Sequence, residues 1–91
     1  MNIIVQKFGG TSVSSSQKRM RVIEKARDAM ARGYFPVLVV SAMGRSGEPY
    51  ATDTLLSLVN KSAGGADPRD TDMLISCGEI ISAVVMASEL R

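Results

Sequence analysis

The chain has 91 residues, of which 45% are hydrophobic and 22% are charged, and its formal net charge is +2. This length allows one modest core, in which folding buries roughly 60–65% of the unfolded surface, and the composition is that of a globular chain rather than a disordered one. The single cysteine excludes a disulfide framework, and the absence of histidine excludes Ser-His-Asp and Cys-His catalysis.

The first forty residues have the pattern of strand, glycine turn, helix and strand. Residues 2–6 are predicted to form a buried strand, because three β-branched side chains follow one another. Residues 37–40 are apolar without alternation, which is typical of a strand covered on both faces. The two strands should therefore be parallel and joined by a right-handed βαβ crossover.

The helix between these strands is predicted over about residues 15–32. A serine supplies the N-cap, and Gly33 is a plausible first residue beyond the end. Its buried face is expected to carry Met20, Ile23, Ala26 or Ala29, and Met30, which recur every three or four residues. The same helix is rich in Lys and Arg, so a nucleic-acid face is an alternative, which the low net charge and the four aromatic residues (two Tyr, two Phe) disfavour.

The second half of the chain is predicted to be a polar loop and two helices. The loop covers residues 41–50, and a short helix over 51–61 should bury Leu55, Leu58 and Val59. After a turn at residues 64–68, a final helix over 70–90 is apolar nearly all round and is expected to be buried. No stretch is expected to span a membrane, and no signal-peptide pattern follows Met1, so we expect a cytoplasmic protein.

Two strands make a small sheet for a domain with so apolar a final helix. We therefore expect an α/β fold of which residues 1–91 are the N-terminal part, with the remainder of the domain and any regulatory domains lying beyond. The alternative is a complete small domain that dimerises through its last helix.

The glycine turn is the sharpest candidate site. It follows the first strand, at the edge where α/β sheets usually bind ligands. Gly9 and Gly10 allow backbone N–H groups to approach a phosphate, and Lys7 adds a positive charge. The spacing matches neither the Walker A loop nor G-x-G-x-x-G, so a plain turn with a solvated lysine remains an equal alternative. Ser41 ends the second strand and should face the same cleft, although alone it could simply cap a turn.

Glu79 is the second candidate, because it lies among apolar residues of the last helix. A carboxylate buried there without a partner would be costly, so it should reach a cation or a pocket. The alternative is an exposed stripe shared with Asp72. The preceding Gly78 lowers helix stability by about 1 kcal/mol relative to alanine, which suggests either a close approach or an irregular helix start at this point.

Four stretches, in order along the chain, resemble aspartate kinases of the amino-acid kinase superfamily. Residues 7–13, KFGGTSV, are similar to the N-terminal signature of that family, and residues 39–44 are similar to its second-strand motif. Residues 52–56 and 72–79, the latter ending in Gly-Glu, are similar to its third and fourth motifs. The resemblance implies that the chain begins a three-layer αβα amino-acid kinase fold.

The resemblance also implies a nucleotide site. Lys7 would be the catalytic residue that stabilises the transferring phosphoryl group. The nucleotide would be bound by Lys7, Phe8, Gly9, Gly10 and Ser41. Magnesium would be held through ATP, with no metal site made by the protein itself.

On the acceptor side, Thr52 and Glu79 would hold the amino acid, with Glu79 pairing with its ammonium group. The implied reaction is ATP-dependent phosphorylation of the β-carboxylate of L-aspartate to 4-phospho-L-aspartate, the first step towards lysine, threonine, methionine and diaminopimelate. The loop over residues 45–50 is longer than in many relatives and resembles the single-function, diaminopimelate-regulated bacterial type. It also makes Thr52 the less secure of the two acceptor residues.

The resemblance implies a homo-oligomer for the full-length protein, and we expect the 91-residue chain alone to be inactive. Neither nucleic acid nor a membrane is expected as a partner. Two alternatives remain: a kinase of the same superfamily with another acceptor, and a stand-alone phosphate- or nucleotide-binding module without catalysis.

Overall fold

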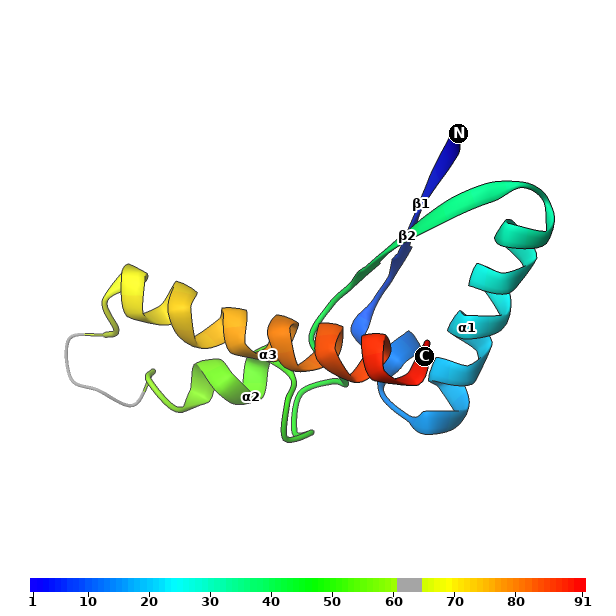
Figure 1. The fold of residues 1–91 in the computed structure, drawn as a ribbon. Helices are drawn as coiled ribbons and strands as arrows, with labels where there is room; N and C mark the ends of the chain where they lie inside the picture. The colour runs from blue at the N-terminus through cyan, green and yellow to red at the C-terminus, as the bar shows by residue number, and fades with distance from the viewer. Residues whose placement is uncertain (61–64) are drawn as a thin grey trace.

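The computed structural model describes residues 1–60 and 65–91. It contains a parallel βαβ unit followed by two helices, so the predicted α/β class is confirmed (Figure 1). The elements are β1 (Asn2–Phe8), the 3-10 turn η1 (Gly10–Val13), α1 (Ser16–Ala31), β2 (Tyr34–Val40), α2 (Thr52–Ser57) and α3 (Pro68–Glu89).

Both strands are longer than the sequence predicted. They pair in parallel without a break from Asn2 opposite Tyr34 to Phe8 opposite Val40, so that Lys7 lies within β1 and not after it. Pro36 lies inside β2, opposite Ile4. Proline cannot donate a hydrogen bond to a neighbouring strand. It is tolerated here because β2 has only one neighbour, β1, in this two-stranded sheet.

The core lies on one face of the sheet. It joins residues of η1, α1 and α3 to half-buried side chains of the strands and of the loop after β2: Val13, Val22, Ile23 and Met86 against Phe8, Leu38, Val40 and Met43. Because side chains alternate along a strand, the other face carries Ile3, Val5, Val37 and Val39, which are exposed. The expectation of strands covered on both faces is therefore wrong for the described residues, because α1 and the end of α3 both pack on the same face.

Helix α1 has the predicted ends but a different buried face. The Ser15 side chain accepts a hydrogen bond from the Lys18 N–H, and Gly33 takes a left-handed conformation with φ of 88°. The buried residues are Val22, Ile23, Ala26 and Ala29, whereas Met20 and Met30 are exposed. The buried residues recur every three or four positions and form one stripe along the helix, and Met20 and Met30 lie outside this stripe.

Helix α2 is shorter than predicted, and α3 begins earlier. α2 ends at Ser57, Leu58 is exposed, and the predicted continuation to Lys61 lies outside the described residues, as does Gly64 of the predicted turn. α3 begins at Pro68, because the Asp67 carboxylate accepts from the Arg69 N–H at 2.8 Å. Proline suits the first helical position, where its missing N–H is not needed.

Helix α3 is not buried as expected. Only Gly78, Ser82 and Met86 are buried, and the opposite side exposes Met73, Ile80 and Val84. By length and composition alone this helix could cross a membrane, contrary to the expectation that no segment would qualify. Core helices of globular proteins pass the same test, and Glu79 near the middle would be costly in a bilayer, so this finding is weak evidence for a span.

The molecule is extended for its size. Its radius of gyration is 15.5 Å, against about 12 Å for a compact domain of this length. Its accessible surface is 6312 Å², against about 5,100 Å² for a monomer of this mass. Figure 1 shows the reason: α2 and the first half of α3 run side by side, away from the βαβ unit.

Candidate active site

The carboxyl ends of the two strands form one edge, and the loops that follow them are bonded together. The Ser41 N–H donates to the Phe8 carbonyl at 3.2 Å, and the Gly44 N–H donates to the Gly10 carbonyl at 3.0 Å. The prediction that Ser41 faces the same edge as the glycine turn is therefore confirmed. The turn itself is tighter than predicted, because residues 10–13 form the 3-10 turn η1.

The two glycines of the turn have different roles. A Cβ at Gly10 would overlap the carbonyl oxygen of Ala42 and would lie 3.0 Å from that of Gly44, so the contact between the two loops requires glycine. At Gly9 a Cβ would meet nothing within 4 Å, and the backbone is in an ordinary extended conformation. Nothing in the described fold requires a glycine at position 9, and its exposed backbone leaves room for a ligand.

Lys7 and Phe8 precede the turn at the end of β1 and point to opposite faces. Lys7 is exposed on the open face of the sheet, whereas Phe8 is half-buried against the core. Lys7 can therefore reach a ligand at the strand ends, while Phe8 anchors the strand. The ring of Phe8 packs against the core, and its carbonyl oxygen already accepts from the Ser41 N–H.

Gly78 brings α3 to this edge. A Cβ there would lie 3.0 Å from the Cβ of Ala42, 3.0 Å from a methyl carbon of Leu55 and 3.1 Å from the Tyr50 carbonyl oxygen. The helix therefore touches the residue after Ser41 and also the chain just before α2. The close approach that the sequence suggested at Gly78 is confirmed.

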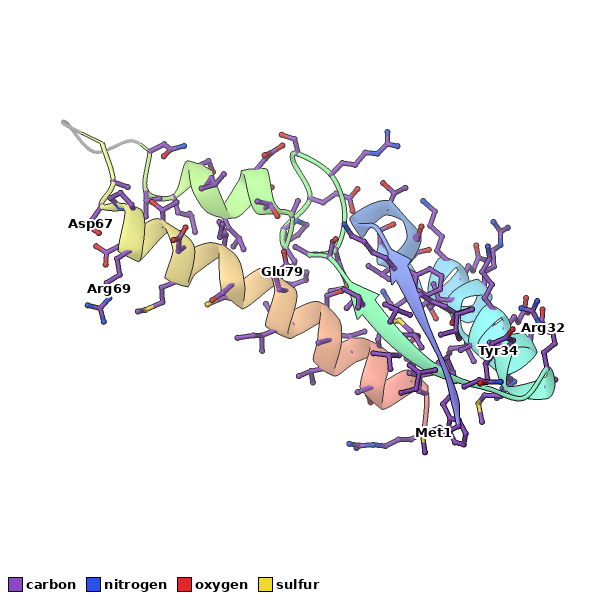
Figure 2. All side chains as sticks on the ribbon, turned by 90° about the horizontal axis from the view of Figure 1, so that it is seen from above. Met1, Arg32, Tyr34, Asp67, Arg69 and Glu79 are labelled. Carbon is purple, nitrogen blue, oxygen red and sulfur yellow. The ribbon has the colours of Figure 1, made fainter. Side chains whose placement is uncertain are left out.

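Glu79 is exposed where α3 crosses the loop after β2, far from the Asp67 end of the helix (Figure 2). The carboxylate has no hydrogen bond or ion pair among the described residues, in agreement with the exposed-stripe alternative. Thr52 is half-buried at the first position of α2, two residues after the Tyr50 that contacts Gly78. The packing at Gly78 thus brings the helix that carries Glu79 against the loop after Ser41 and against the chain that leads into Thr52.

The structure also places two arginines at the turn that the sequence reading missed. Arg45 donates from Nε to the Thr11 hydroxyl at 3.2 Å. Arg19 donates to the Val13 carbonyl at 2.9 Å and forms an ion pair with Glu89 at 2.8 Å. The signal for Arg45 was its position just after the second strand. Arg19 gave no signal, because its partner Glu89 lies seventy residues away in sequence.

Together these contacts give the sheet edge two neighbouring parts, the glycine turn on one side and the α2–α3 segment on the other. The glycine turn offers open backbone and an exposed ammonium group for an anion such as phosphate. The α2–α3 side offers a carboxylate and a hydroxyl, which suit a ligand with an ammonium group. Lys7 and Glu79 are both exposed, and neither makes an ion pair among the described residues, so both charged groups are available to ligands.

Comparison with known proteins gives a consistent family. The model of the amino acid kinase family matches residues 2–91. The chain is 52% identical over 90 residues to Aspartokinase 1 of Bacillus subtilis (strain 168), covering 99% of this chain and 22% of that protein. It is 40% identical over its whole length to the aspartokinase of Geobacillus stearothermophilus, of which it covers 21%.

A solved structure agrees. The chain is similar to the crystal structure of aspartate kinase from Synechocystis, with a TM-score of 0.84 and 38% identity over 97% of this chain and 14% of that chain. The chain thus spans about a fifth of the length of the curated relatives that it matches. By its sequence and by its fold, this chain belongs to the amino acid kinase family.

Proposed function

We propose that this chain forms the acceptor side and part of the phosphate side of an aspartate kinase, which transfers the γ-phosphoryl group of ATP to the β-carboxylate of L-aspartate. The observation that carries the proposal is the packing of Gly78 against Ala42 and the Tyr50 carbonyl. It brings a helix with an exposed carboxylate to the sheet edge that carries the glycine turn. The similarity to aspartokinases over nearly all of this chain supports the choice of acceptor.

On the acceptor side, Glu79 would pair with the ammonium group of aspartate, and the Thr52 hydroxyl would hydrogen-bond to the same molecule. The close packing of Gly78 holds the helix backbone in place one residue before Glu79. A carboxylate already exposed at an edge does not need to break an internal ion pair to bind substrate. These two residues would orient the β-carboxylate towards the strand ends.

On the phosphate side, Lys7 would neutralise charge on the transferring group, the backbone N–H groups of Gly9 and Gly10 would hold phosphate oxygens, and Ser41 would lie beside the terminal phosphate. The nucleophile is a carboxylate with a pKa of about 4, so it is ionised at neutral pH and needs no general base. Phosphoryl transfer depends mainly on positioning and charge stabilisation. The lack of histidine is therefore no obstacle to this chemistry.

Magnesium would enter with ATP, since this ion is usually held by substrate phosphates and water together with one or two carboxylates. The described residues contain no cluster of three acidic or cysteine side chains that could cage an ion alone. We further propose a cytoplasmic homo-oligomer that opens the route to lysine, threonine, methionine and diaminopimelate. Residues 1–91 would be the N-terminal part of its catalytic domain.

The test is ADP release by the product of the whole reading frame, with ATP, Mg²⁺ and either L-aspartate or L-glutamate. We expect release with aspartate and background release with glutamate. Release with glutamate alone would replace aspartate kinase by another member of the family. Nucleotide binding without release on either acceptor would favour a binding module.

A further inference from the structure

The loop that follows β2 carries a cation which the proposed function has not used. Arg45 comes directly after Gly44, and its Nε donates to the Thr11 hydroxyl at 3.2 Å. Thr11 belongs to η1, the turn expected to hold phosphate. The guanidinium group therefore lies at the glycine turn, although 34 residues separate Arg45 from Thr11.

The backbone around Arg45 holds it there. Gly44 is left-handed, with φ of 91°, and its N–H donates to the Gly10 carbonyl at 3.0 Å. The Glu48 carboxylate accepts from the Arg45 backbone N–H at 3.3 Å, and the Glu48 N–H donates back to the Arg45 carbonyl at 2.9 Å. The turn is thus closed on itself and tied to the phosphate side of the edge.

The charge of Arg45 is not neutralised by this arrangement. Within residues 1–60 and 65–91 the one ion pair is Arg19 with Glu89, so Glu48 binds the Arg45 backbone without pairing with its side chain. The terminal nitrogens of Arg45 make no hydrogen bond to the described residues, and the residue is exposed. A guanidinium group with free terminal N–H donors matches the fork geometry of a phosphate group.

We propose that Arg45 binds the terminal phosphate of the nucleotide, as a second cation beside Lys7 at the glycine turn. The inference rests on the proposed function for the identity of the anion. It assigns a use to the loop over residues 45–50. Lys7 reaches the phosphates from the end of β1, and Arg45 reaches them from the loop after β2.

The experiment measures equilibrium binding of ATP and of AMP to the product of the whole reading frame. The variants are Arg45→Ala and Arg45→Lys. The control is Arg32→Ala, because Arg32 lies at the end of α1 that is away from the glycine turn (Figure 2). We expect Arg45→Ala to weaken ATP binding by roughly 10- to 100-fold, the range for a hydrogen bond to a charged group. AMP binding should change less than about 2-fold, because AMP lacks the terminal phosphate, and Arg45→Lys should recover part of the loss.

Arg45→Ala that binds ATP as tightly as the wild type would overturn the inference, as would equal losses for ATP and AMP. Each result is independent of catalysis. If the wild type binds ATP but phosphorylates neither acceptor, the proposed function fails while the role of Arg45 is still measured. If the wild type binds ATP no more tightly than AMP, both Arg45 and the phosphate site are refuted.

Discussion

Lys7 is the residue on which the proposed chemistry depends most. It is exposed at the end of β1, and no ion pair of the described residues involves it. Lys7→Ala in the full-length protein should lower kcat by at least ~10²-fold, which is the typical cost of losing a group that stabilises transition-state charge. Lys25→Ala, which removes an exposed lysine from the middle of α1, is the matched control. Wild-type turnover by Lys7→Ala would contradict the role.

Glu79 permits a separate test of the acceptor side. Glu79→Gln keeps the shape of the side chain but removes the charge that would pair with the substrate ammonium group. The KM for aspartate should rise by roughly 10- to 100-fold, while the KM for ATP stays within about 2-fold.

Asp72→Asn is the control for Glu79, because Asp72 is an exposed carboxylate two turns earlier on the same helix. Steady-state kinetics with each substrate varied in turn would decide. If the KM for aspartate and the KM for ATP rise equally, Glu79 supports the structure of the whole site and does not bind the amino acid specifically.

At the scale of elements, the loop after β1 and the loop after β2 are held together by the close contact at Gly10. Gly10→Ala would push a methyl group into the Ala42 carbonyl. Overpacking of this kind costs roughly 1–3 kcal/mol, so the midpoint of thermal unfolding should fall. Gly9→Ala meets nothing within 4 Å and should leave unfolding unchanged.

The pair of glycine variants also separates folding from binding. If phosphate oxygens approach the Gly9 backbone, Gly9→Ala should raise the KM for ATP while the protein stays as stable as the wild type. Thermal unfolding and ATP kinetics on the same preparations provide both readings. If the KM for ATP of Gly9→Ala equals that of the wild type, the phosphates do not bind at the Gly9 backbone.

At the scale of the whole molecule, the described chain leaves two apolar surfaces uncovered. One is the open face of the sheet, with Ile3, Val5 and Val37, and the other is the outer side of α3, with Ile80 and Val84. The accessible surface exceeds that of a compact monomer of this mass by about 1,200 Å². This excess supports the proposal that further elements of a larger catalytic domain cover both surfaces.

The 91-residue chain expressed alone should therefore self-associate and release no ADP with ATP, Mg²⁺ and aspartate, whereas the product of the whole reading frame should be active. Sedimentation velocity and the ADP assay at matched concentrations would test this. Aspartate-dependent turnover by the isolated chain would contradict the prediction. A discrete, stable dimer would favour the alternative of a small domain that pairs through its last helix.

Local signals in the sequence were enough to predict the order of the elements and the sheet edge where chemistry is expected. Strand runs, the Ser15 cap and Gly33 are local signals, because β-branching, capping and a left-handed glycine act within a few residues. The parallel pairing followed from the crossover rule. That rule was enough to place Ser41 beside the glycine turn, and the motif resemblance pointed to the correct family.

Which faces are buried, and how the helices contact the site, became known only from the three-dimensional packing. Periodicity shows that α3 is apolar but not which elements cover it, so its burial was predicted wrongly. The same limit applied to α1, where periodicity did not show that Val22 and Ala29, and not Met20 and Met30, face the strands. The contacts of Gly78 with Ala42 and of Arg45 with Thr11 join residues more than thirty positions apart. Such contacts depend on backbone approach in three dimensions, which no local pattern encodes.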